Sequence, residues 1–125
     1  MGWSYLAVAI GGAVGCCARY GLSQLIHLFY GRSFPVATLT INVLGSFALG
    51  FLFFWTLERL TIGPTLRLAI LTGGLGGFTT FSTFMVETLI LVEEGAFGRA
   101  ALYVLLSVVL GFAAAFAGGY LSRVI

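Results

Sequence analysis

Charge is scarce in this 125-residue chain, which has six arginines, four glutamates and neither lysine nor aspartate. Charged residues make up only 8% of the chain, against 60% hydrophobic residues, and the mean hydropathy is +1.11. A water-soluble fold of this length cannot bury so much apolar surface. The composition therefore excludes a soluble domain and indicates a protein whose partner is membrane lipid, and we expect no nucleic-acid partner.

Groups that bind metals through their side chains are also few. The chain has one histidine and two cysteines, and Cys16 and Cys17 are adjacent, so they cannot pair with each other without distorting the backbone. We interpret both as small packing residues. No charge precedes Arg19, so the first apolar segment lacks the basic start of a signal peptide and should remain as a helix.

Four apolar stretches are each long enough to cross a bilayer, which takes about 20 residues of helix. They cover approximately residues 3–28, 35–57, 65–92 and 97–121. The connections between them are short and leave no room for a soluble domain. The sequence predicts an all-α, multi-pass membrane protein in which residues 1–125 form a single transmembrane domain.

The arginines are divided evenly between the two sides of the predicted membrane domain. With four spans both termini lie on one side, together with Arg59, Arg67 and Arg123. Arg32 and Arg99 lie on the other side, and Arg19 lies nearer to that side. Such a balance gives no preferred orientation under the positive-inside rule. Copies should therefore insert both ways, which favours an antiparallel, dual-topology homodimer.

The third span contains a cluster of glycines that a regular helix accommodates poorly, at about 1 kcal/mol for each Gly relative to Ala. We predict a break over residues 73–80, near mid-bilayer. Non-helical backbone at that depth persists only where it is buried in protein or lines a polar cavity. In an antiparallel dimer the two breaks would meet at the twofold axis, and their free carbonyls would repel unless a small monovalent cation lay between them.

Polar residues form two stripes within the other spans. Thr38 and Asn42 are four residues apart on the second span, and Tyr103 and Ser107 share a face of the fourth. These groups are neutral hydrogen-bond donors, as are Ser82 and Thr83 in the third span, and neutral donors suit an anion. Hydrogen bonding between helices is the alternative role for such residues.

Aromatic and charged residues add to this pattern. Phe81 and Phe84 flank the hydroxyl pair, and the electropositive edges of their rings could contact a small anion. Glu87 is a candidate vestibule residue because it lies inside its span but away from the centre. Arg19 is a second candidate because it could draw anions into an aqueous mouth, and snorkelling or a structural ion pair is the alternative role.

Three segments together resemble the Fluc family of fluoride channels, also called CrcB. They are GGAVGCCARY at residues 11–20, TLTINVLGSFALG at 38–50 and GGLGGFTTFSTF at 73–84. The resemblance implies a double-barrelled antiparallel dimer with two fluoride pores and a central sodium ion. Matched by position, Asn42, Phe81 and Phe84 correspond to pore residues, Ser82 and Thr83 to a polar track, and Gly76 and Thr79 to the residues whose carbonyls hold sodium.

The resemblance implies a function without catalysis: passive export of fluoride across a bacterial inner membrane, which protects the cell from fluoride toxicity. Two other classes stay open on the residues alone. A small proton-coupled exporter normally needs an acidic residue in its first helix, where this chain has Arg19 and no acid. A membrane scaffold would transport nothing.

Overall fold

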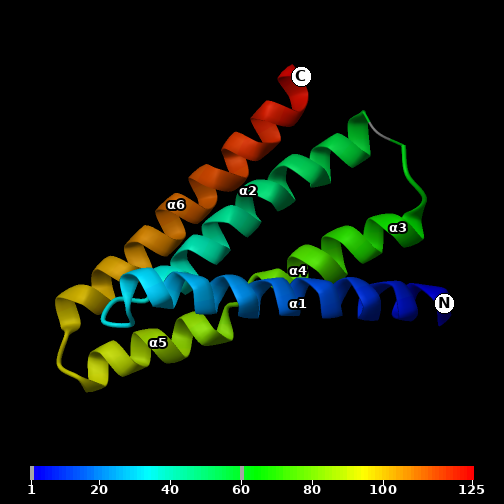
Figure 1. Ribbon diagram of the computed structural model, residues 1–125. Coiled ribbons are helices and arrows are strands. Elements are labelled where there is room, and N and C mark those ends of the chain that lie inside the picture. Colours follow the sequence, from blue (N-terminus) through cyan, green and yellow to red (C-terminus); the bar gives the residue numbers. More distant parts are fainter. Residues whose placement is uncertain (1, 60) are drawn as a thin grey trace.

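The computed structural model describes residues 2–59 and 61–125, which form helices and their connections (Figure 1). In chain order the elements are α1 (Gly2–Tyr30), α2 (Val36–Glu58), α3 (Pro64–Leu68), the π-helix η1 (Ala69–Leu75), α4 (Gly76–Phe78), α5 (Ser82–Glu93) and α6 (Phe97–Val124). The all-α prediction is confirmed.

Four helical segments are long and apolar enough to cross a membrane. They are α1, α2, the composite segment Pro64–Glu93 that runs from α3 to α5, and α6. The observed bounds differ from the predicted ones by a few residues at most. The two termini and the α2–α3 connection lie toward one end of the molecule, and the other two connections lie at the opposite end (Figure 1). We call these the terminal end and the loop end.

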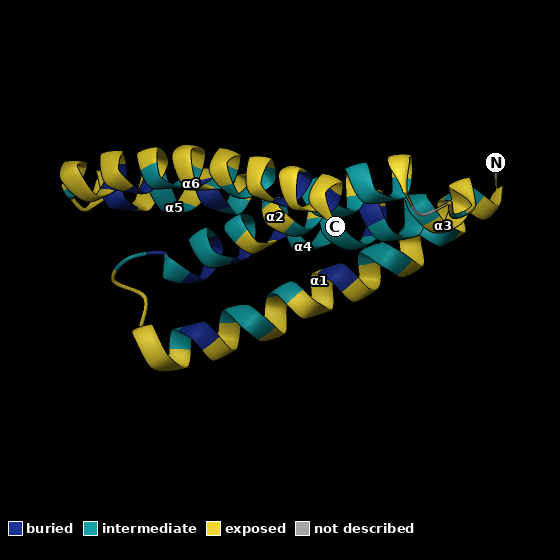
Figure 2. Ribbon diagram, turned by 90° about the horizontal axis from the view of Figure 1, so that it is seen from above, coloured by how far each residue is buried: buried dark blue, intermediate teal, exposed yellow. Residues whose placement is uncertain are grey.

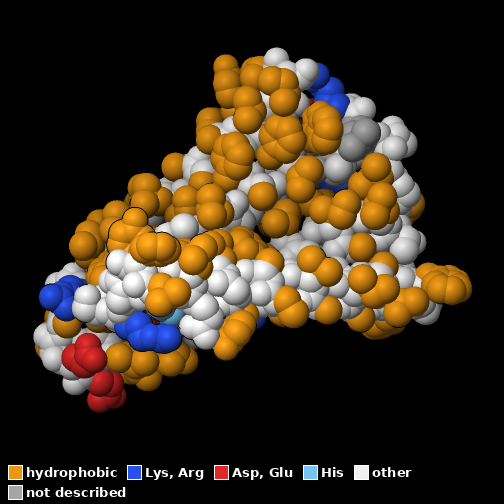
Figure 3. Space-filling model, viewed as in Figure 1, with side chains coloured by type: hydrophobic (Ala, Val, Ile, Leu, Met, Phe, Trp, Pro, Cys, Tyr) orange, Lys and Arg blue, Asp and Glu red, His pale blue; other side chains and the backbone are white. Residues whose placement is uncertain are grey.

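The helices form two pairs. α2 packs along α6, and α1 packs against η1 and α4, while α5 extends from the break along the loop-end half of α6. Much of the helix surface is exposed (Figure 2). In Figure 3 the charged side chains on the visible face lie mainly toward the two ends, with hydrophobic side chains spread over the surface between them. This distribution suits a bilayer, whose apolar core surrounds the middle of a spanning protein.

The third span breaks later than the sequence predicts. The glycines at 73–77 remain helical, within the π-helix η1 and the short α4, and the backbone becomes extended only at Thr79, where ψ is 160°. The predicted start of the break at residue 73 is therefore wrong. The physical reason is close packing on α1, because a Cβ at Gly73 would lie 2.6 Å from the carbonyl oxygen of Val8, and a Cβ at Gly77 would lie 2.9 Å from that of Gly12.

Glycines on α1 complete the same contact. A Cβ at Gly11 would collide with the carbonyl of Ala69, and a Cβ at Gly15 with the carbonyl of Gly74. Gly11 and Gly15 are thus small residues at which two helices make close contact. Close backbone approach of this kind supplies van der Waals packing in lipid, where no hydrophobic drive operates between helices.

Replacing Gly15 by alanine should destabilise the protein. The added methyl group would force the backbones of α1 and η1 apart, at a cost of about 1–3 kcal/mol, typical of an overpacked core. The matched control is Gly21→Ala on the same helix, where nothing lies within 4 Å of the added atom. Thermal unfolding in detergent should show a lower midpoint for the first variant alone. Equal midpoints for both variants would contradict the proposed contact.

Candidate functional site

The break between α4 and α5 is held by the side chain of Asn42 on α2. Its Nδ2 donates to the carbonyl of Thr80 at 2.9 Å, and its Oδ1 accepts from the Thr80 N–H at 2.9 Å. In a continuous helix that N–H would bond to the carbonyl of Gly76, four residues earlier. The Asn42 amide therefore replaces helical hydrogen bonds with contacts from another helix, which stabilises the extended backbone.

Both half-helix ends at the break have side-chain partners. The Thr80 hydroxyl accepts from the N–H of Thr83 at 3.3 Å and donates to its hydroxyl at 3.1 Å, next to the start of α5. On the other half, Nε of Arg19 donates to the carbonyl of Gly77 at 3.2 Å. A guanidinium at a helix C-terminus is favourable, because that end carries partial negative charge. The structure thus places Arg19, predicted as a vestibule residue, against the break itself.

Four aromatic rings form a continuous series of edge-to-face contacts beside the break. Phe81 and Phe84 are 5.9 Å apart, Phe84 and Tyr103 are 4.9 Å apart, and Tyr103 and Phe34 are 5.6 Å apart, measured between ring centroids. Phe81 is 72% exposed, whereas Phe84 is only 7% exposed. Phe81 and Phe84 thus contact each other, with the Phe84 ring anchored by burial and the Phe81 ring projecting from the surface. Phe34, in the connection before α2, carried no sequence signal.

The polar residues near the anchored ring are buried. Tyr103 is completely buried and donates its hydroxyl to Oε1 of Glu87 at 2.8 Å, and Thr38 is also buried. The hydroxyl of Ser107, one turn after Tyr103 on α6, is buried and has no hydrogen-bond partner among the described residues. An unpaired buried hydroxyl is unfavourable and available to a ligand or water. The predicted stripe on α6 is therefore directed inward.

Two cavities lie on either side of these contacts. The break cavity, of about 220 Å³, is lined by Asn42, Ser46, Thr79, Thr80 and Phe81 among others. The loop-end cavity, of about 250 Å³, is lined by His27, Arg32, Glu87 and Glu94 among others. Ser82 is exposed at the start of α5. Asn42 and Phe81 thus share one cavity, while Glu87 belongs to the other.

Backbone carbonyls at the break fit a monovalent cation. The described residues contain no group of three or more His, Cys, Asp or Glu side chains that could hold a metal ion. Oxygen ligands could come from Gly76, because the N–H that would satisfy its carbonyl is donated to Asn42 instead. Thr79, in extended backbone three residues later, offers the second predicted carbonyl.

Removing the Asn42 amide should destabilise the break. Asn42→Ala leaves the N–H and carbonyl of Thr80 without partners, and each unsatisfied buried group costs about 1–3 kcal/mol. We expect a loss of about 2 kcal/mol or more in stability, read as a lower thermal unfolding midpoint. Asn42→Asp keeps the acceptor, so its unfolding midpoint should lie between that of Asn42→Ala and that of the parent protein. Ser46→Ala, which lines the same cavity, is the matched control, and a loss as large as that of Asn42→Ala would contradict the role of the amide.

Comparison with known proteins places these features in a family. Residues 6–119 match the family model described as "CrcB-like protein, Camphor Resistance (CrcB)". A protein of Acidithiobacillus ferrooxidans named "Fluoride-specific ion channel FluC" is 52% identical over 116 residues, 93% of each chain. A protein of the same name from Magnetococcus marinus is 48% identical over 94% of this chain and 96% of its own length. Another from Roseiflexus sp. is 48% identical over 96% of this chain and 97% of its own length. The chain belongs to the CrcB-like family.

Proposed function

We propose that this chain is a fluoride channel that lets fluoride leave the cell passively, down its electrochemical gradient, and so protects a bacterial cell from fluoride toxicity. The proposed location is the inner membrane. The curated relatives bear the name of a fluoride-specific channel, and they match nearly the full length of this chain. The observation that carries the proposal is the juxtaposition of the Asn42 amide and the projecting Phe81 ring in one cavity beside the helix break.

The chemistry of the break cavity favours a small anion. Asn42, Ser46, Thr79 and Thr80 offer neutral polar groups, and the residues that line this cavity include no acid. The edges of aromatic rings carry partial positive charge, so a projecting Phe81 can contact an anion without a full counter-charge. A fully charged ligand would bind the anion more tightly and slow its release, whereas conduction needs weak, successive contacts.

Further residues extend this route along the protein. Phe84 holds the inner end of the phenylalanine pair, and Ser107 supplies a buried hydroxyl that is free to donate. The other proposed route residues are Thr38, Ser82, Thr83 and Tyr103. Glu87 accepts the hydrogen bond that Tyr103 donates, so the Tyr103 proton is not available to an anion, and Tyr103 would contribute to the route through its ring.

We further propose that the working channel is an antiparallel homodimer. A single copy leaves Phe81 72% exposed, although its partner ring Phe84 is anchored. The even division of arginines allows insertion in both orientations. The break lies near the middle of its span, so a twofold axis in the membrane plane could bring the two breaks together. Phe81 of each copy would then be covered by the other.

In that dimer we propose a sodium ion held by the Gly76 and Thr79 carbonyls of both copies. Support comes from the carbonyl of Gly76, which loses its helical donor to Asn42. Two half-helix C-termini brought together would repel each other, and a cation between them would remove that repulsion. The ion would therefore stabilise the dimer and take no part in conduction.

Fluoride efflux from loaded liposomes tests the proposed function. Phe81→Ile removes the ring edges, and we expect the efflux rate to fall at least about tenfold, equivalent to about 1.4 kcal/mol of barrier. The matched control is Phe112→Ile, since Phe112 is 73% exposed on α6 and should face lipid. Chloride-loaded vesicles should show no comparable efflux. Fluoride movement at the parent rate in Phe81→Ile would reject the pore assignment, and coupled proton flux would indicate an exporter or antiporter instead.

The dimer and its cation can be tested on the same preparation. In a variant with Cys16→Ala, Cys17→Ala and Ile125→Cys, an impermeant maleimide should label about half of the copies in sealed vesicles, as equal insertion in both orientations requires. Replacing sodium by choline should lower the thermal unfolding midpoint of the parent protein. Labelling of all copies, or of none, from outside would sink the antiparallel arrangement. An unchanged midpoint would reject the sodium site.

A further inference from the structure

A third cavity lies between the terminal end of the molecule and the helix break. This cavity, the terminal groove, has a volume of about 550 Å³ and lies between α2 and the α3–η1 segment. Its lining includes Leu49, Phe53, Pro64, Arg67, Thr72 and Gly76. Leu49 also lines the break cavity, and Gly76 is only three residues from Thr79 in that cavity. The terminal groove thus adjoins the break cavity, and Leu49 lies in the wall of both.

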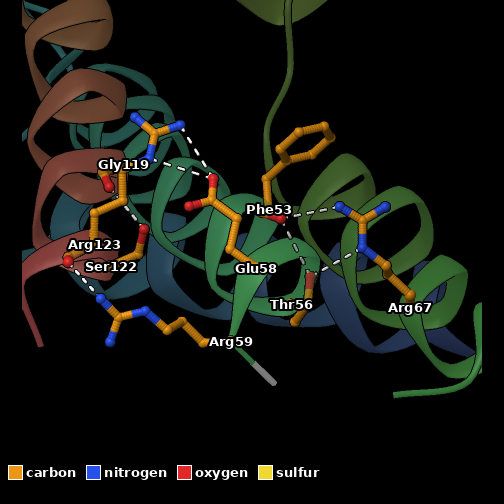
Figure 4. Close-up of polar contacts among 8 residues, drawn as sticks. All are labelled: Phe53, Thr56, Glu58, Arg59, Arg67, Gly119, Ser122 and Arg123. Carbon is orange, nitrogen blue, oxygen red and sulfur yellow. Dashed lines mark hydrogen bonds and ion pairs between the residues drawn. The ribbon is translucent and has the colours of Figure 1, made fainter. Parts of the chain in front are cut away.

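Arg67 lies at the outer part of this groove in a fixed position. Its Nε donates to the hydroxyl of Thr56 at 2.9 Å, and its Nη2 donates to the carbonyl of Phe53 at 3.0 Å. The guanidinium carbon also lies 4.7 Å from the centre of the Phe53 ring. Figure 4 shows Arg67 reaching across from α3 to these groups near the end of α2. The side chain is therefore held by α2 and is not free to move away from the groove.

The positive charge of Arg67 is not neutralised by these contacts. Both hydrogen-bond acceptors of Arg67 are uncharged. Among the described residues, the ion pair at the terminal end joins Arg123 to Glu58 and does not include Arg67 (Figure 4). A guanidinium at the edge of an apolar cavity keeps much of its field, since the low-dielectric walls screen it less than water does. An anion or water must therefore complete its surroundings.

Beyond Arg67, the lining of the terminal groove continues toward the break through Thr72 and Gly76. Thr72 is exposed and lies on the lining between Arg67 and Gly76. It belongs to the π-helix η1, whose wider turn brings residues four to five positions apart onto one face. A hydroxyl donor thus follows the guanidinium along the groove, which is the order in which an arriving anion would exchange water for protein contacts.

We propose that Arg67 is the anion-attracting residue at the terminal-end mouth of the conduction path, and that the terminal groove admits small anions as far as Gly76. This inference rests on the proposed function. The substitution Arg67→Gln should remove the attraction, while Arg67→Lys should retain most of it. Arg59→Gln is the matched control, because Arg59 is an arginine at the same end that donates to the Arg123 carbonyl and does not belong to the groove lining.

Thiol chemistry tests the groove without any need for fluoride transport. In the protein with Cys16→Ala and Cys17→Ala, Thr72→Cys is treated with a sulfonate and, separately, with a trimethylammonium methanethiosulfonate. We expect Arg67→Gln to lower the ratio of the anionic to the cationic rate at least about threefold, since a fixed charge nearby favours the oppositely charged reagent. Arg59→Gln should leave the ratio unchanged. No reaction with either reagent, or an equal ratio with and without Arg67, would overturn the proposal.

Efflux at two ionic strengths separates attraction from a merely structural role. At about 10 mM salt, where charges act over about 30 Å, Arg67→Gln should slow fluoride efflux about fivefold. At about 1 M salt, where the range is about 3 Å, its rate should lie within about twofold of the parent. An equal loss at both ionic strengths would mean that Arg67 only supports the fold, and would overturn the proposal. If the parent itself moves no fluoride, the proposed function fails, while the thiol ratios still decide the role of Arg67.

Discussion

The side-chain amide of Asn42 is the contact on which the rest of this structure depends. It meets Thr80 with one donor and one acceptor, both at 2.9 Å, and so substitutes for the peptide groups of a helix that stops there. Without such a partner, extended backbone inside a membrane would leave polar groups unsatisfied, at several kcal/mol for each group. Because α2 supplies this contact, the third span can divide into two half-helices whose ends lie within the bilayer.

Close packing fixes the position of the half-helix that precedes the break. The glycines of α1 and η1 allow the two backbones to touch, and Arg19 on the same α1 then reaches the carbonyl of Gly77 at 3.2 Å. The Arg19 guanidinium therefore neutralises part of the negative charge at the end of α4, while the Asn42 amide binds the backbone of Thr80 just beyond that end. One helix end thus receives two kinds of support, and the carbonyl of Gly76 stays open between them.

Much of the fold follows from composition, since a helix satisfies its own backbone hydrogen bonds within lipid and four apolar stretches fix the number of spans. The glycine cluster identified the right span but gave too early a start for the break. Sequence spacing cannot distinguish a glycine that interrupts a helix from one that permits contact with a neighbour, and the approach of α1 decides between them. The roles of Arg19 and Phe34 were hidden for the same reason, because both depend on partners 58 and 69 residues away in the chain.

The candidate site was easier to predict in its residues than in its contacts. The motif places Asn42, Phe81 and Phe84, but the double hydrogen bond of Asn42 to Thr80 needs the three-dimensional register of α2 against the break. The structural role and the proposed pore role of Asn42 are compatible, since the residue also lines the break cavity. A residue that both shapes the cavity and faces it ties the geometry of the path to the stability of the fold.

The cavities at the terminal end and the loop end of the molecule differ in charge, and this difference bears on the proposed antiparallel pair. The loop-end cavity contains Arg32 together with Glu87 and Glu94, so cationic and anionic groups face each other there. The terminal groove contains Arg67 without an acid in its lining. A single copy would therefore present a net positive mouth on one side of the membrane and, with one arginine against two glutamates, a net negative mouth on the other. Two inverted copies would give each side one mouth of each kind, so that the pair would present the same charges to both sides, while fluoride concentration and membrane potential set the direction of net flow.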